Sequence, residues 1–391
     1  HHNVNVGSVM EVATGFPGNL GMRPNDAKYF AETLRHNGYS TAAFGKWHET
    51  PTWEVSVSGP YFRWPTHSGF DKFYGFIGGE TNQWEPVIFD GVTRVPKKDQ
   101  EDYHFTTDMT TEAVEWVKFQ QAMTPEKPFF IYYATGATHA PHHAPKKWIE
   151  KYKGKYAAGW DVLRQQRLEK QKELSLVDES WVVVERDDRA QSWEQAKNTD
   201  KNWQQLRMEV YAAMIDSVDQ NVGRLLNSLD QLGVAEDTLV LFLTDNGGCA
   251  ETPGGNDPTQ VPGPKEFYSH VGPGWATASN TPFRRYKQYC HEGGIATPLL
   301  ARWPSVIEAG SRSEQVGHII DFLPTFLDMA NAEYPDTHPQ FGGSTIPLDG
   351  KSLLSVLEGK QRTPHEYLYW HWATNRAVRK GDWKVAWDRH A

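Results

Sequence analysis

Runs of apolar residues alternate along the chain with segments whose apolar residues recur every three or four positions. The second pattern predicts helices, because such positions fall on one face of a helix. It occurs over residues 27–38, 106–123 and 208–233. Each of these segments is followed by an apolar run typical of a strand buried in a sheet, at residues 41–44, 129–135 and 238–248.

The order of these elements predicts the fold class. Asn25 or Asp26 would cap the first helix and Gly38 would end it. Helix followed by strand, repeated three times, indicates an α/β fold with a mostly parallel, doubly wound central sheet flanked by helices. The stretch 145–205 departs from this order, because it is dense in Lys, Glu, Gln and Asp, and we expect it to be a surface insertion of helix and loop.

Residues capable of chemistry follow each of the three predicted strands. They are Lys46 and His48 after the first, His139, His142 and His143 after the second, and Asp245 and Asn246 after the third. Ligands bind outside the carboxyl ends of the strands in an open parallel sheet, so three such groups at one edge would form a site. Residues two apart in an extended chain point to the same side, so Lys46 and His48 would face the site together.

Each group also has a plainer interpretation. A Lys-x-His pair at a strand end is commonly a surface feature, and Asp-Asn-Gly-Gly is commonly a turn. His142 and His143 would then line the wall of a loop. The histidine cluster lacks the Cys or His partners that a zinc site needs, whereas the oxygens of Asp245 and Asn246 suit a hard cation.

Another basic cluster lies within residues 279–304, where Arg284, Arg285, Lys287 and His291 precede a Gly-Gly pair and a short apolar strand. Such a cluster is usually a solvated face. Because this cluster precedes a glycine turn that leads into a strand, its cationic side chains could also be held over the predicted site.

Charge and composition exclude several classes of function. The 391-residue chain has a formal net charge of -9, whereas nucleic-acid-binding domains are normally basic. No apolar run approaches the roughly 20 residues needed to span a bilayer, so no membrane anchor is expected. Two cysteines, Cys249 and Cys290, are too few for a disulfide framework, and Cys249 is expected to be a buried small residue. The compartment stays open between bacterial periplasm and cytoplasm.

Several motifs together carry a family resemblance. "GYSTAAFGKWH" (38–48), "GATHAPHH" (136–143), "LTDNGG" (243–248) and "YKQYCHEGGIATPLLARWP" (286–304) resemble, in order and separation, the type I sulfatases of the alkaline-phosphatase-like superfamily, most closely bacterial arylsulfatases. The segments 63–86 and 318–330 add to the match. The resemblance implies a sulfatase catalytic α/β domain over 1–360 and the start of a smaller C-terminal α+β subdomain over 361–391.

The resemblance also implies roles for six residues. Asp245 and Asn246 match two ligands of a single calcium ion. Lys46 matches the lysine that binds the nucleophile and the sulfate, and His48 matches the histidine that takes a proton from the formylglycine hydroxyl. His139 and Lys287 match the groups that bind sulfate and assist the leaving oxygen.

The family nucleophile is a formylglycine, made by a maturation enzyme from Cys or Ser in Cys/Ser-x-Pro/Ala-x-Arg. Neither Cys249 nor Cys290 heads that motif. The resemblance therefore implies a chain truncated at both ends, with the first family strand and the nucleophile upstream of residue 1.

These observations predict an arylsulfatase that hydrolyses a small-molecule or saccharide sulfate ester to an alcohol or phenol and inorganic sulfate. The alternatives are a phosphate or phosphonate ester hydrolase of the same fold, and a non-catalytic binder of sulfated ligands if the protein begins at His1. Four tryptophans near the expected site would either stack on the leaving group or pack long loops, namely Trp53, Trp64, Trp84 and Trp275.

Overall fold

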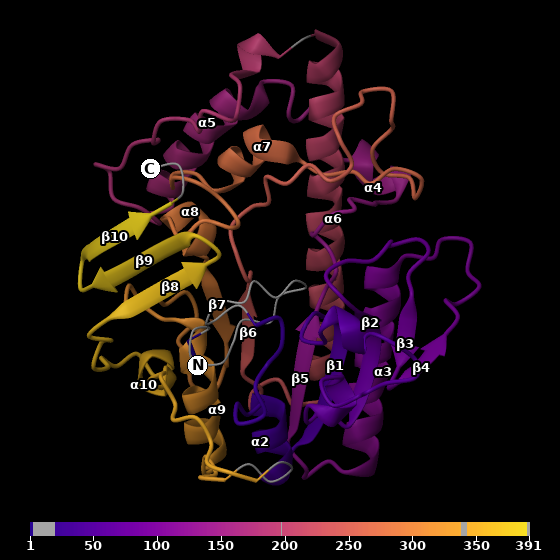
Figure 1. Cartoon of the computed structure of the whole chain (residues 1–391), viewed down its shortest axis with the longest axis vertical. Coiled ribbons are helices and arrows are strands. Elements are labelled where there is room, and N and C mark those ends of the chain that lie inside the picture. The colour runs from indigo at the N-terminus through magenta and orange to yellow at the C-terminus, as the bar shows by residue number, and fades with distance from the viewer. Residues whose placement is uncertain (3–19, 197, 338–341, 389–391) are drawn as a thin grey trace.

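A five-stranded sheet forms the centre of one half of the molecule (Figure 1). The structure is a computed structural model that describes residues 1–2, 20–196, 198–337 and 342–388. The sheet has the order β4-β3-β2-β1-β5, and β1 runs parallel to both β2 and β5. Its strands are β1 (Ser40–Trp47), β2 (Lys72–Ile77), β3 (Ile88–Asp90), β4 (Thr93–Val95) and β5 (Phe129–Ala134).

Helices cover both faces of this sheet, as the predicted doubly wound fold requires. Successive side chains of a strand point to opposite faces. Phe44 of β1 packs in one core cluster with Phe105 and Met109 of α3 (Phe105–Met123), whereas Trp47 packs in another with Ala31 of α2 (Phe30–His36). The long helix α6 (Asn198–Gln231) lies against α3.

The predicted helices and strands are largely confirmed, but several ends differ. The N-cap of α2 is Tyr29, which makes no capping hydrogen bond through its side chain, so the predicted cap at Asn25 or Asp26 is wrong. Asn25 and Asp26 instead lie in a turn, in which the amide of Ala27 donates to the carbonyl of Pro24 at 3.3 Å. The guanidinium of Arg23 lies 3.8 Å from the ring centroid of Tyr29. Helix α6 begins at Asn198 rather than at residue 208.

The third predicted strand behaves differently from the other two. β6 (Val240–Leu243) pairs antiparallel with β7 (Leu299–Arg302) in a two-stranded sheet, and within the described residues it does not pair with β5. Phe242 of β6 is 48% exposed, so the prediction of a buried strand is wrong for β6. The prediction also fails for β5, which has no buried residue and in which Tyr132 is 39% exposed. Val240 nevertheless packs beside Ile131 on helices α3 and α6, so β6 lies over the same helical layer as β5 (Figure 1).

The segment 145–205 is more than the predicted surface insertion. Trp160 and Trp193, both from this segment, pack edge-on at 4.6 Å between ring centroids, and Trp275 joins them in one core cluster. Aromatic packing of this kind overrides the charged composition that suggested a surface role. Four further helices are α4 (Lys146–Glu150), α5 (Gly159–Glu173), α7 (Gly272–Ser279) and α8 (Glu292–Ile295).

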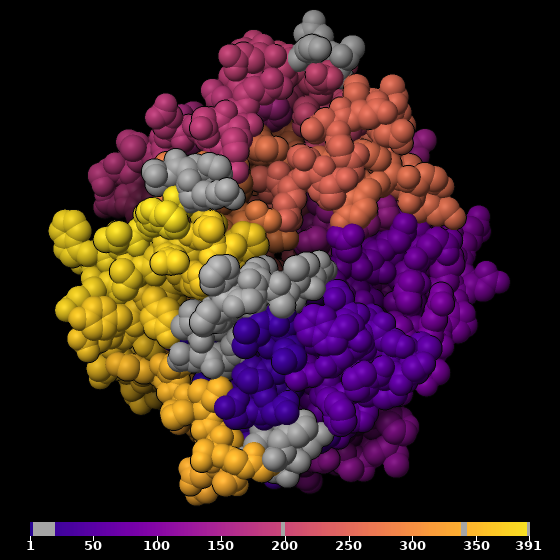
Figure 2. Space-filling view, in the orientation of Figure 1, coloured from indigo at the N-terminus to yellow at the C-terminus, as the bar shows by residue number. Residues whose placement is uncertain are grey.

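The C-terminal strands form a separate antiparallel sheet of order β10-β9-β8. They are β8 (Leu368–Trp372), β9 (Asn375–Lys380) and β10 (Trp383–Trp387), and helices α9 (Phe322–Ala330) and α10 (Leu354–Leu357) precede them. In the space-filling view this sheet (yellow) forms one flank of the molecule (Figure 2). None of the described helices is long and apolar enough to cross a membrane.

Candidate active site

The ends of three strands and one later loop supply the predicted site residues. Lys46 is the penultimate residue of β1 and His48 follows the strand directly. His139 lies in the loop after β5, and Asp245 lies in the loop after β6. Lys287 belongs to the loop between α7 and α8.

His139 and Lys287 form a directly bonded pair. The Nδ1 atom of His139 lies 2.7 Å from the carbonyl oxygen of Ala140, and a carbonyl only accepts, so Nδ1 carries the proton. Nε2 is then free to accept from Lys287 Nζ at 3.2 Å. Burial, followed by the charges of Lys287 and Lys46, lowers the pKa of His139 below its usual 6.5. The imidazole is therefore neutral near pH 7.

Asp245 changes the pKa values of Lys287 and of the nearby Tyr132. Asp245 contributes to the raised pKa of Lys287, and with Glu49 it helps burial to raise the pKa of Tyr132 to about 12. Lys46 and Lys287 thus lie within electrostatic reach of His139, and Asp245 lies within reach of Lys287. The side-chain amide of Asn246 donates to the carbonyl of Gly247 at 2.8 Å.

A close backbone approach fixes the Asp-Asn-Gly-Gly loop. A Cβ atom on Gly247 would lie 1.7 Å from the carbonyl oxygen of Gly293, and the amide of Gly247 donates to the carbonyl of Gly294 at 3.0 Å. The amide of Lys287 donates to the carbonyl of Gly248 at 3.0 Å. The glycine is therefore required by contact with α8, the short helix that follows Lys287, rather than by a positive φ.

The loop that carries Lys287 is held by the C-terminal sheet. Gln288 has a φ of 80°, a left-handed conformation that non-glycine residues seldom adopt. Its carbonyl accepts from the amide of Asn375 in β9 at 2.8 Å. Arg285, with a φ of 68°, pairs with Asp187 at 2.6 Å and with Asp388 at 3.3 Å. Arg285 thus serves the scaffold, so the basic cluster is only partly a site feature.

Carboxylates at the site were not among the predicted residues. Glu251 accepts from Lys287 at 2.9 Å, and Glu80 lies 4.0 Å from His139 Nδ1 while it accepts from the hydroxyl of Tyr268. The positions of these two carboxylates in the sequence could have indicated that they belong to the site. Glu80 lies inside the quoted motif at 63–86, and Glu251 follows Asp245 in the same loop.

Other candidates prove to be packing residues. His142 and His143 are buried, and Gln83 donates its backbone amide to His143 Nδ1 at 3.3 Å. Their plainer interpretation, as residues that line a loop, is the one observed. Trp64 and Trp275 are fully buried in core clusters, so neither can stack on a ligand.

A calcium ion would find part of its ligand set here. The carboxylate of Asp245 and the amide oxygen of Asn246 are hard oxygen donors of the type calcium prefers. No group of three or more His, Cys, Asp or Glu side chains in the described part of the chain is arranged to hold a metal. These two side chains fit the ion, but they would form only part of its shell of six to eight oxygens.

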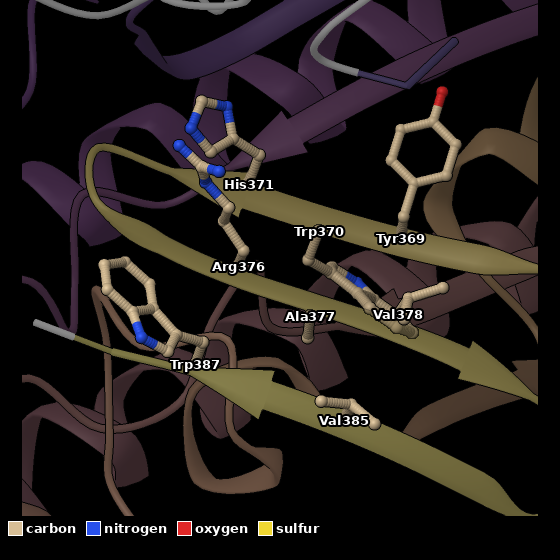
Figure 3. A pocket seen from close by; sticks show the side chains of 8 residues that line it. All are labelled: Tyr369, Trp370, His371, Arg376, Ala377, Val378, Val385 and Trp387. Atoms are coloured by element: carbon tan, nitrogen blue, oxygen red, sulfur yellow. The ribbon is translucent and has the colours of Figure 1, made fainter. Parts of the chain in front are cut away.

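A hollow of about 460 Å³ lies elsewhere, on the C-terminal sheet (Figure 3). Its walls include His371, Arg376 and Trp387, which point to the same side of the strands. None of the six predicted site residues lines it. The hollow is therefore not taken as the candidate active site, despite its size.

Comparison with known protein families gives two matches. The family described as Sulfatase matches residues 1–332, which is most of the chain. The family described as N-sulphoglucosamine sulphohydrolase, C-terminal, matches residues 284–389. The second match contains both the Lys287 loop and the strands that hold it.

Relatives and solved structures agree with these matches. An uncharacterized sulfatase of Schizosaccharomyces pombe is 27% identical over 95% of this chain and 70% of its own length. An arylsulfatase of Klebsiella aerogenes is 28% identical over 85% of this chain and 74% of its own length. The crystal structure of Ps i-CgsB in complex with k-i-k-neocarrahexaose shares the fold, with a TM-score of 0.65 and 22% identity over 99% of this chain and 71% of that one.

Proposed function

The chain belongs to the sulfatase family, and from this premise we propose that the protein hydrolyses sulfate esters of phenols or saccharides to the free hydroxyl compound and inorganic sulfate. The observation that carries the proposal is the His139–Lys287 pair, 3.2 Å apart, within electrostatic reach of Lys46 and Asp245. The similarity to an arylsulfatase supports an aryl sulfate as a substrate, and a related fold crystallised with an oligosaccharide supports a saccharide.

The chemistry of the reaction explains the basic residues. A sulfate monoester is an anion, and its transition state places more charge on the leaving oxygen and the sulfuryl oxygens. Positive groups fixed in advance around those oxygens lower the barrier. In our proposal the ammonium groups of Lys46 and Lys287 hold the sulfate, and Lys287 also donates to the leaving oxygen.

The histidines would assist proton transfer. A neutral His139 presents the lone pair of Nε2 to Lys287, so the imidazole orients the ammonium that would donate a proton to the leaving oxygen. His48 would take a proton from the nucleophile. A calcium ion held in part by Asp245 and Asn246 would supply positive charge, and a formylglycine from a segment upstream of residue 1 would supply the nucleophile.

The test uses the full-length, matured protein and a chromogenic aryl sulfate. We expect Lys287→Ala and His48→Ala each to lower kcat by roughly 100-fold or more, because each removes a group that acts in the transition state. Lys265→Ala is the control, since Lys265 pairs with Glu85 outside the site. Unchanged turnover in both site variants would contradict the assigned roles.

Further experiments test the metal and distinguish the sulfatase from the phosphonate hydrolase and the non-catalytic binder. Chelation of divalent ions should abolish turnover and calcium should restore it, whereas full activity after chelation excludes the metal from the proposal. A higher kcat/KM for an aryl phosphonate than for the matched aryl sulfate would favour the phosphonate hydrolase. Binding of a sulfated saccharide with no release of sulfate would favour the non-catalytic binder.

A further inference from the structure

Glu251 is a carboxylate with three donors around it, all from the loops of the candidate site. Its Oε2 atom accepts from Lys287 Nζ at 2.9 Å and from the thiol of Cys249 at 3.0 Å, and its Oε1 atom accepts from the side-chain amide of Gln288 at 2.5 Å. Burial and the carboxylate raise the pKa of Cys249 to about 11, so the thiol is an uncharged donor at neutral pH. The carboxylate is therefore fixed from two sides.

The ammonium of Lys287 has three N–H donors in a tetrahedral arrangement. One points to Glu251 and a second to His139 Nε2 at 3.2 Å. Two directed hydrogen bonds determine the direction of the third N–H. A four-carbon side chain without such partners would sample several rotamers, and ordering it during the reaction would cost entropy.

We propose that Glu251 is a positioning residue for Lys287, which it orients so that the ammonium contacts His139 and keeps its third N–H for a substrate oxygen. This inference rests on the proposed function, because it assigns Lys287 to the substrate. It adds a residue that lies just outside the quoted motif at 243–248. Glu251 acts through Lys287 and does not itself touch the sulfate.

A comparison with an ordinary ion pair shows why this one is different. Glu85 and Lys265 lie 3.2 Å apart, and both side chains are about half exposed, so their pair is of the kind that contributes little. Glu251 is 40% exposed, but its partner Lys287 is only 23% exposed and is also bonded to a neutral histidine. Among the described residues, the charged or titratable groups that act on Lys287 include Glu251, Cys249, Asp245 and His139.

The experiment replaces Glu251 by Gln in the full-length protein, which keeps the shape of the side chain and removes the charge. We expect kcat for the aryl sulfate to fall by about tenfold or more, because Lys287 loses its fixed direction, and Glu251→Asp to recover part of the loss. The carboxylate helps to raise the pKa of Lys287, so in Glu251→Gln the alkaline limb of the kcat/KM profile should move to lower pH. Glu85→Gln should change neither quantity.

A direct measurement keeps this test separate from that of the proposed function. The pKa of Lys287, followed by NMR after labelling of lysine side chains, should be lower in Glu251→Gln whether or not the wild type releases sulfate. No sulfate release by the wild type, together with a lowered pKa, would reject the proposed function and, with it, the catalytic part of this inference. An unchanged pKa, or an unchanged kcat and pH profile in an active enzyme, would overturn the role of Glu251.

Discussion

At the scale of single residues, burial decides which histidines are neutral. His139 is neutral beside Lys287, and the same holds more strongly for His104, which precedes α3 and is 4% exposed. His104 Nε2 donates to the carbonyl of His143 at 3.2 Å, and the ring packs edge-on against Trp84. Burial lowers the pKa of His104 to about 4.

This shift predicts a pH dependence of stability. Between pH 6.5 and 4 the histidine binds a proton in the unfolded state, where its pKa is near 6.5, but not in the folded state. The free energy of unfolding therefore falls as the pH drops below 6.5 toward 4. Over that window the loss from this residue is about 3 kcal/mol. Urea unfolding at pH 7, 5.5 and 4.5 should give a shallower decline for His104→Asn than for the wild type. Parallel declines would contradict the assignment.

At the scale of elements, the loop after β6 packs closely against the segment that runs from Lys287 into α8. The contact of Gly247 with the carbonyl of Gly293 leaves no room for a side chain, and it sets where Asp245 and Asn246 stand relative to Lys287. Backbone contact of this kind positions several site residues at once.

Gly247→Ala should therefore be costly. The added methyl would meet a backbone oxygen at 1.7 Å, so we expect a loss of about 1–3 kcal/mol in the free energy of unfolding and at least a tenfold lower kcat. Gly223→Ala is the matched control, because nothing lies within 4 Å of its added Cβ in α6, and alanine favours a helix by roughly 0.5–1 kcal/mol. Equal stability of the two variants would show that the loops separate easily.

At the scale of the whole molecule, the C-terminal sheet supports the active-site half. Asn375 of β9 bonds to Gln288, Lys384 of β10 pairs with Glu292, and Asp388 pairs with Arg285. All three contacts reach the segment around Lys287. The sheet thus extends the active-site scaffold instead of standing apart from it (Figure 1).

Asp388→Asn tests this coupling. Asp388 is fully buried, so loss of its charge beside Arg285 should lower the free energy of unfolding by about 2 kcal/mol, and loosening of the segment should reduce kcat. Asp230→Asn, which breaks an exposed pair with Arg302, should cost less than about 1 kcal/mol. Thermal unfolding and turnover measured on both variants decide the point. A stable and fully active Asp388→Asn variant would show that the C-terminal sheet does not support the active-site segment.

Much of the scaffold was predictable because helix and strand periodicity is local. Helix α3 and strand β5 begin and end within a residue of the predicted bounds, and the parallel pairing of β1 with β5 follows from helix–strand alternation. The antiparallel pairing of β6 with β7 was not predictable in this way. It depends on contacts between residues about sixty positions apart, and no local pattern encodes such a partner.

The sequence by itself determined which segments form the main helices and strands, and which residue types meet near their ends, because periodicity and side-chain chemistry are properties of neighbouring residues. Only the tertiary structure decided how those residues are used. In the folded chain Lys287 is hydrogen-bonded to His139 and Glu251, and Arg285 pairs with Asp388. Trp275 is buried in a core cluster. The physical reason is that hydrogen bonds, ion pairs and burial depend on distance in space, which the folded chain alone defines.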